Sequence, residues 1–139
     1  HEVPGHVSGP WLHTDGALIK AIMQSTARRT HWAGLWQDGA AQWHRVSHNA
    51  VETGYLITER PATVPYGLTS RELEVLTLLT RSRTNVQIAS ELMISSKTAG
   101  RHIENLMSKL GCVSRTGAAV LALEEGLTQL HAASRPPCP

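Results

Sequence analysis

One stretch of the 139-residue chain places charged and polar side chains opposite a row of apolar ones. Between Ser96 and Leu110, the apolar residues recur at i, i+4, i+7 and i+11, which is the pattern of a helix with one buried face. The apolar row is Ala99, Ile103, Leu106 and Leu110, and the row roughly opposite is Lys97, Arg101, Glu104 and Ser108. Such a polar face, on a helix braced from behind, suits the major groove of DNA. The alternative is an ordinary solvated helix face.

The start of this helix gives a second reason to expect an anion. Ser95 is the predicted N-cap, so the first backbone N–H groups of the helix have no partner within it. The positive end of the helix dipole lies at the same place. We therefore expect a phosphate near Ser95, Ser96 and Lys97.

Three further helices are predicted around this one, each from its own capping residues. Thr69 with Glu72 and Thr84 with Gln87 are capping boxes, and Ser114 caps the last helix. Gly111 and Gly126 stand where helices end. The predicted helices run from Thr69 to about Thr80, from Thr84 to near Leu92, from Ser96 to Leu110 and from Ser114 to near Glu125, with a turn at Met93–Ser95 between the second and third.

The first half of the chain has a different pattern. Asp15–Arg28 is helical in its apolar spacing. HWAGLWQ (His31–Gln37) and AAQWHRV (Ala40–Val46) flank Asp38–Gly39, which predicts a hairpin with a type I′ turn. Trp32 and Trp36 would share one face, and Gly54–Glu59 would add a third strand. The predicted fold class is an α+β N-terminal fragment followed by an all-α four-helix domain.

These patterns divide the chain into four segments. Residues 1–59 are the partial α+β region, residues 60–67 (RPATVPYG) a linker, residues 68–130 the helical domain and residues 131–139 a disordered tail. The chain begins at His1 without a methionine, so we expect the first half to be the end of a longer sensory domain.

Bulk properties exclude several classes of protein and leave others open. The net charge is only +2, and residues 68–130 hold seven Lys/Arg against six Asp/Glu, so DNA binding must depend on where the charges lie. No apolar run is long enough to cross a membrane and no secretion signal is present, which favours a cytoplasmic protein. No catalytic constellation or cofactor motif stands out. His44 and His48 lie too far apart along one strand to share a metal ion, so no metal or cofactor is expected.

The sequence resembles the LuxR-type (LuxR/FixJ) helix-turn-helix family over Leu68 to about Leu127. The motifs that carry the resemblance are LTSRELEVLTLL, then TNVQIASELMISSKTAGRHIENLMSKLG, then SRTGAAVLALEEGL, in the family's order and spacing. The first half is loosely similar to the C-terminal part of a GAF-type sensory domain. The resemblance implies a bacterial transcriptional regulator that binds double-stranded DNA and has no enzymatic activity.

The resemblance also implies roles for individual residues. Ser96–Leu110 would be the recognition helix, with phosphate and base-edge contacts from Thr98, Gly100, Arg101, Glu104 and Asn105. Lys97 would meet the DNA backbone, and Asn85 would anchor the preceding helix on a phosphate. The fourth helix would pair two copies of the chain through Ala118, Leu121, Ala122 and Glu125. RNA polymerase is a further candidate partner.

Some residues depart from the family pattern. Gly100 stands where the family often has a charged residue, and Ser82 replaces a common glycine in the first turn. A glycine inside a helix costs about 1 kcal/mol relative to alanine. Glu104 has the wrong charge for a phosphate and would need a donor such as the cytosine N4 amine. These departures leave the operator sequence open. The sequence also does not give the sensed signal or the sign of regulation.

Two other functions are compatible with the helical half. One is a protein–protein interaction module that uses the Ala-rich fourth helix. The other is a promoter-reading domain like that of a sigma factor, which shares the helix-turn-helix but acts only on the polymerase. Salt-dependent affinity for duplex DNA distinguishes a DNA-binding domain from a protein-binding one.

Overall fold

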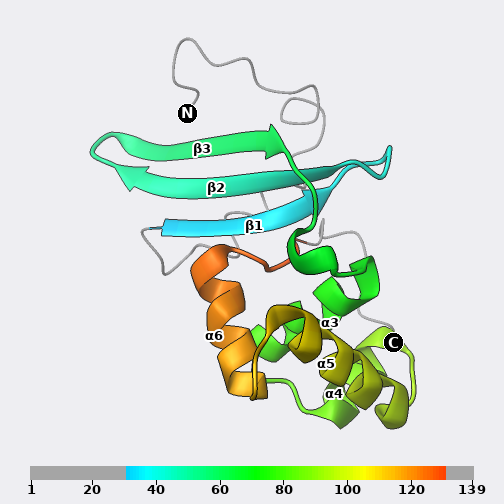
Figure 1. The fold of residues 1–139 in the computed structure, drawn as a ribbon. Helices are drawn as coiled ribbons and strands as arrows, with labels where there is room; N and C mark the ends of the chain where they lie inside the picture. The colour runs from blue at the N-terminus through cyan, green and yellow to red at the C-terminus, as the bar shows by residue number, and fades with distance from the viewer. Residues whose placement is uncertain (1–30, 131–139) are drawn as a thin grey trace. The chain divides into compact units, whose positions relative to one another are not determined.

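The computed structural model describes residues 31–130, which form two compact units (Figure 1). The strands lie in the first unit, which ends at Ala62 and also includes Leu130, and the helices lie in the second, Thr63–Gln129. The helix predicted at Asp15–Arg28 and the predicted tail lie outside the described residues. A sheet followed by four helices confirms the predicted fold class.

The first unit is an antiparallel sheet of three strands in the order β1-β2-β3. The strands are β1 (His31–Gln37), β2 (Trp43–Val51) and β3 (Gly54–Pro61). Gly34 pairs with Val46, which places Trp32, Trp36 and Val46 on one face of the sheet. Trp32 and Val46 form an apolar core with Leu130, and Trp36 packs against it. The predicted common face of the two tryptophans is therefore confirmed.

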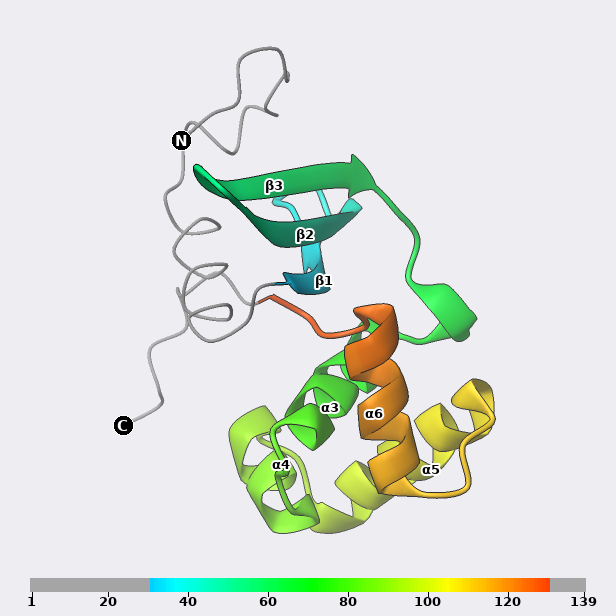
Figure 2. The ribbon, with the colours of Figure 1, turned by 90° about the vertical axis from the view of Figure 1, so that its left-hand side faces the viewer.

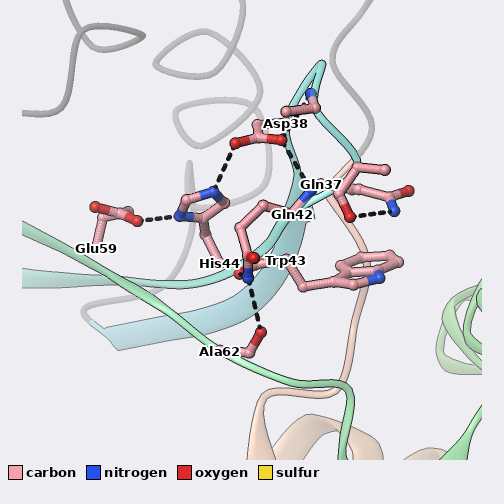
Figure 3. A network of polar contacts seen from close by, with 9 residues as sticks. Gln37, Asp38, Gln42, Trp43, His44, Glu59 and Ala62 are labelled. Carbon is pink, nitrogen blue, oxygen red and sulfur yellow. Dashed lines mark hydrogen bonds and ion pairs between the residues drawn. The ribbon is translucent and has the colours of Figure 1, made fainter.

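The turn between β1 and β2 differs from the predicted type I′ turn. Gln37 pairs with Trp43, so the loop is wider than two residues, and its positive φ falls on Ala41 (62°). The Asp38 carboxylate accepts hydrogen bonds from the backbone N–H groups of Ala40 and Gln42, both at 2.9 Å (Figure 3). These side-chain bonds stabilise a wider loop. As a result β2 begins at Trp43, where the sequence predicted Ala40, and it runs on to Val51.

The second unit contains a short 3₁₀ turn and four α-helices. They are η1 (Pro65–Gly67), α3 (Ser70–Thr80), α4 (Asn85–Leu92), α5 (Ser96–Leu110) and α6 (Arg115–Glu125). Both predicted capping boxes form, at Thr69 with Glu72 and at Thr84 with Gln87. The predicted extents of all four helices are confirmed, because local capping chemistry sets them.

Helix α3 is the centre of this unit. Both α5 and α6 pack on it, and α4 packs on α5 (Figures 1 and 2). Leu73, Leu76, Ile88 and Leu106 are fully buried in the resulting core. No single described helix is long and apolar enough to cross a membrane; α5 and α6 taken together, bent by 60°, satisfy only length and composition.

An ion pair between exposed Lys109 and buried Glu72 fixes α5 to the start of α3. Lys109 Nζ lies 2.7 Å from Glu72 Oε2 and donates to the Gly67 carbonyl oxygen at 2.9 Å. The same Glu72 oxygen accepts the Thr69 backbone N–H at 2.8 Å. Glu72 is almost fully buried, and these donors satisfy its charge. Lys109 therefore ties the C-terminal end of α5 to both η1 and the α3 N-cap.

We expect the free energy of unfolding of Glu72→Gln to fall less steeply than that of the wild type as the pH is lowered. Burial alone would raise the pKa of Glu72, but hydrogen bonds from Lys109 and Thr69 outweigh it, so the pKa lies below its ordinary value of 4.5. Such a carboxylate contributes stability that is present above the unfolded-state pKa and is lost as the pH falls through the folded-state pKa. At neutral pH the variant should lose roughly 1.5–3 kcal/mol, the usual effect of a hydrogen bond to a charged group.

Urea unfolding of both proteins at a series of pH values down to about pH 3 measures this difference. Glu124→Gln is the matched control, since Glu124 is exposed and forms no ion pair with residues 31–130. An unchanged acid slope in Glu72→Gln would contradict the assignment.

Candidate nucleic-acid interface

A tight turn sets the angle between α4 and α5. Met93 adopts the left-handed conformation (φ 56°, ψ 46°) and ends α4, and the Ile94 N–H donates to the Ala89 carbonyl at 2.9 Å. Ser95 then caps α5 by accepting the Thr98 N–H at 3.0 Å. The predicted turn at Met93–Ser95 is therefore confirmed, and it makes α4 and α5 a helix-turn-helix.

Helix α5 has one buried and one free face. The predicted apolar stripe is buried, namely Ala99, Ile103, Leu106 and Leu110. The opposite side is exposed, and most of the predicted contact residues lie there: Lys97, Thr98, Arg101, Glu104 and Asn105. The helix is thus held from behind while its polar face is open to a partner.

The first turn of α5 brings the predicted phosphate contacts together. Ser95, Ser96, Lys97 and Thr98 are all exposed. The Ser95 and Thr98 hydroxyl oxygens lie 2.8 Å apart, so both side chains are turned toward the cap. Ser96 and Lys97 therefore flank free backbone N–H groups at the positive end of the helix.

Asn85 and Gly100 come together from two different helices. A Cβ built on Gly100 would lie 3.7 Å from Asn85 Nδ2, so the start of α4 lies beside the first half of α5. Asn85 Oδ1 accepts a hydrogen bond at 3.0 Å from Arg115, the first residue of α6. Arg115 lies in the SRTGAAVLALEEGL motif of the family resemblance, but no contact was predicted for it, because its partner is far away in the chain and no local pattern links the two.

The near-neutral charge of this unit conceals an uneven distribution. Three basic residues are paired within the unit: Arg71 with Glu74, Arg83 with Glu91 and Lys109 with Glu72. Among residues 31–130, the remaining cations of the unit form no ion pair, and they are Arg81, Lys97, Arg101 and Arg115. Lys97 and Arg101 lie on α5, so unpaired positive charge is present on the exposed helix.

The dimer residues predicted on α6 need a correction. Ala118 and Ala122 have no exposed surface, because these small side chains allow α6 to pack closely on α3. They cannot contact a partner in this conformation. Leu121 is half-buried, and Glu125 accepts the Tyr66 hydroxyl at 2.7 Å. The exposed apolar residues of α6 are Val120 (48%) and Leu123 (40%), which the sequence analysis did not select.

A second polar cluster lies in the sheet unit. The two ring nitrogens of His44 face carboxylates, with Nε2 3.0 Å from Asp38 Oδ2 and Nδ1 at Glu59 (Figure 3). The hydrogen bond from His44 is the largest cause of the lowered pKa of Asp38. With both nitrogens engaged, His44 does not activate a nucleophile, and the cluster ties the β1–β2 loop to β3. Residues 31–130 contain no group of His, Cys, Asp or Glu arranged to hold a metal ion.

A helix-turn-helix with a buried back and an exposed, partly basic front defines a DNA-binding domain. Comparison with known families agrees, since residues 67–122 match the family described as bacterial regulatory proteins, LuxR family. The spore germination protein GerE of Bacillus subtilis is 49% identical over 63 residues, which are 45% of this chain and 85% of GerE. The chain therefore belongs to the LuxR family of bacterial regulatory proteins, a DNA-binding family and not a class of enzyme.

Other relatives match the same part of the chain. The transcriptional regulatory protein LiaR of Bacillus subtilis is 51% identical over 55 residues, or 40% of this chain and 26% of LiaR. The solved structure of the transcription factor GerE has 39% identity and a TM-score of 0.42, covering 46% of this chain and 96% of that one. A Vibrio cholerae VqmA structure has 20% identity and a TM-score of 0.46, covering 81% of this chain and 62% of that one. The chain spans most of GerE but about a quarter of LiaR.

We expect Gly100→Ala to stabilise the helical unit by about 1 kcal/mol, because alanine restricts the unfolded chain more than glycine does. The added methyl group would meet Asn85 Nδ2 at 3.7 Å, an ordinary contact distance. The midpoint of thermal unfolding should rise. Gly111→Ala is the control, and it should destabilise because Gly111 has a φ of 66°. A lower midpoint for Gly100→Ala would show that the helices meet more tightly here.

Proposed function

We propose that this chain binds specific sites on double-stranded DNA, with α5 as the recognition helix in the major groove. One observation carries the proposal: the back of α5 is buried along its whole length while its front remains exposed. A helix fixed in this way can enter a groove without losing its support. Regulation of transcription in the bacterial cytoplasm is the corresponding biological role, and RNA polymerase is a further proposed partner.

The proposed contacts fall into two groups. Asn85, Ser95, Ser96 and Lys97 would bind phosphates, because they surround free N–H groups and a positive side chain. The residues proposed to face base edges are Thr98, Gly100, Arg101, Glu104 and Asn105. Arg101 is the strongest of these for specificity, since a guanidinium can donate two hydrogen bonds to guanine O6 and N7.

Substitutions at Lys97 and Arg101 should have different effects. Arg101→Ala should weaken binding to a selected site by roughly 1–3 kcal/mol and relax specificity at one base pair. Lys97→Glu should weaken binding to all sequences and reduce the dependence of affinity on salt, because it removes a phosphate contact. Selection of bound duplexes from a random pool, followed by anisotropy titrations at several salt concentrations, measures both effects.

Arg60→Glu is the control for charge reversal, as Arg60 is exposed on β3, outside the helical unit. It should leave binding nearly unchanged. If Arg101→Ala bound the selected site as tightly as the wild type, Arg101 would not read sequence. If the wild type showed no salt-sensitive affinity for duplex DNA, the proposed function itself would be wrong.

We further propose that α6 pairs two copies of the chain, through a face revised from the sequence prediction. The revised face leaves out Ala118 and Ala122, which are buried. It uses Val120 and Leu123 instead, because their side chains are exposed on the helix. Leu121 and Glu125 stay as flanking residues. Exposed apolar side chains at this spacing favour a helix–helix contact, since burying each of them gains roughly 1.5–3 kcal/mol.

Leu123→Asp should therefore shift a dimer to the monomer without unfolding it. A charge at the centre of the apolar face costs desolvation only when a second copy covers it. Sedimentation velocity over a range of protein concentrations measures the shift. Val86→Asp is the matched control, because Val86 is also an exposed apolar residue but lies on α4. A Leu123→Asp protein that still dimerises would place the interface elsewhere.

A second candidate function uses the same α6 face. Val120 and Leu123 could bind a different protein, which would make the helical unit a protein-interaction module. Weak, salt-insensitive DNA binding would favour that reading, and affinity that appears only with polymerase would favour a sigma-like role. For the rest of the chain we propose a sensory role for the strand-containing part. The linker predicted at residues 60–67 begins later than its first residue, because β3 runs on to Pro61.

A further inference from the structure

Arg115 makes a two-pronged contact with the start of α4. Its Nη1 donates to Asn85 Oδ1 at 3.0 Å, and its Nη2 donates to the Arg83 carbonyl oxygen at 2.7 Å. Arg83 and Asn85 flank Thr84, the N-cap of α4. The guanidinium of α6 therefore holds both the backbone and the side chain at the point where α4 begins.

This contact determines which way the Asn85 amide points. A guanidinium only donates hydrogen bonds, so the amide atom that faces Arg115 must be the oxygen. The NH₂ group then points away from Arg115 and lies on the side of α5, 3.7 Å from the position of a Cβ on Gly100. Among residues 31–130, no acceptor receives this NH₂ group. It is a donor set beside the recognition helix and open to an outside acceptor.

An asparagine amide without such a partner rotates easily, because its last torsion has a broad, two-fold preference. Rotated by half a turn, Asn85 would present its carbonyl oxygen to a phosphate, and two acceptors repel. We propose that Arg115 is a positioning residue that keeps the Asn85 NH₂ group directed at the DNA backbone. This inference rests on the proposed DNA-binding function and assigns a role to a residue outside the helix-turn-helix.

Two simpler roles for Arg115 need to be distinguished from positioning. Arg115 could supply only positive charge to the DNA surface, or only a tether between α6 and α4. Arg115→Lys separates the first, because lysine keeps the charge but lacks the planar fork that reaches two acceptors. Asn85→Asp keeps an acceptor for Arg115 and removes the amide hydrogens, but it also adds a negative charge. Asn85→Ala, which adds no charge, is therefore measured beside it.

The experiment measures binding of the full 139-residue chain to a fluorescein-labelled duplex of random sequence, since a phosphate contact affects all sequences alike. Arg115→Lys and Asn85→Asp should each weaken binding about tenfold, the effect of one strong hydrogen bond. In the Asn85→Ala background, Arg115→Lys should have no further effect, because there is no amide left to orient. Arg60→Lys is the matched control and should bind like the wild type.

Three results would overturn the inference. Wild-type affinity in Arg115→Lys would mean that only the charge matters. Wild-type affinity in Asn85→Asp would mean that the NH₂ group contacts nothing. Independent losses that multiply in the Asn85→Ala, Arg115→Lys double variant would indicate a tether. If the wild-type chain itself showed no salt-sensitive binding, the proposed function would fail first, and the two failures are thus distinguishable.

Discussion

The burial of one side of α5 is the constraint on which the rest of the helical unit depends. Ala99, Ile103, Leu106 and Leu110 are removed from water against α3 and α4, and the larger side chains gain roughly 1.5–3 kcal/mol each. Packing along about three turns fixes both the axis and the rotation of α5. The exposed residues then have a defined direction, although none of them takes part in the packing. The Lys109–Glu72 pair fixes the far end of the same helix, so α5 is held over its whole length.

Local chemistry explains why much of this unit could be predicted from sequence. A capping box needs residues three apart, and a buried stripe needs a period near 3.6. Both patterns can therefore be recognised in a short stretch of sequence. The hairpin loop was predicted wrongly because the Asp38 side chain bonds to the loop backbone and so widens the turn. Ala118 and Ala122 were misassigned because a small residue suits both a dimer contact and close packing within one domain. Periodicity alone does not separate these two cases.

The Arg115–Asn85 contact illustrates what sequence reasoning cannot reach. The two residues are 30 positions apart, and only the folded arrangement of the helical unit brings them together. Asn85 was singled out only through the family resemblance, and no local pattern pairs it with Arg115. The same holds for Tyr66, whose hydroxyl donates to Glu125 from 59 positions away. Contacts of this kind follow from the fold, which local capping and periodicity specify only one helix at a time.

Although the helical unit is nearly neutral, its positive charges are distributed unevenly. Ion pairs within the helical unit occupy Arg71, Arg83 and Lys109 and leave Lys97 and Arg101 free on α5. Since residues 68–130 hold seven Lys/Arg against six Asp/Glu, the overall charge of this segment gives little steering toward DNA, and well-placed short-range donors matter more for the proposed affinity. Under that condition the direction of a single amide matters more than it would on a strongly basic domain. An Asn85 amide held in one orientation by Arg115 would therefore complement the proposed recognition helix, on which Gly100 offers no side chain and Glu104 no positive charge.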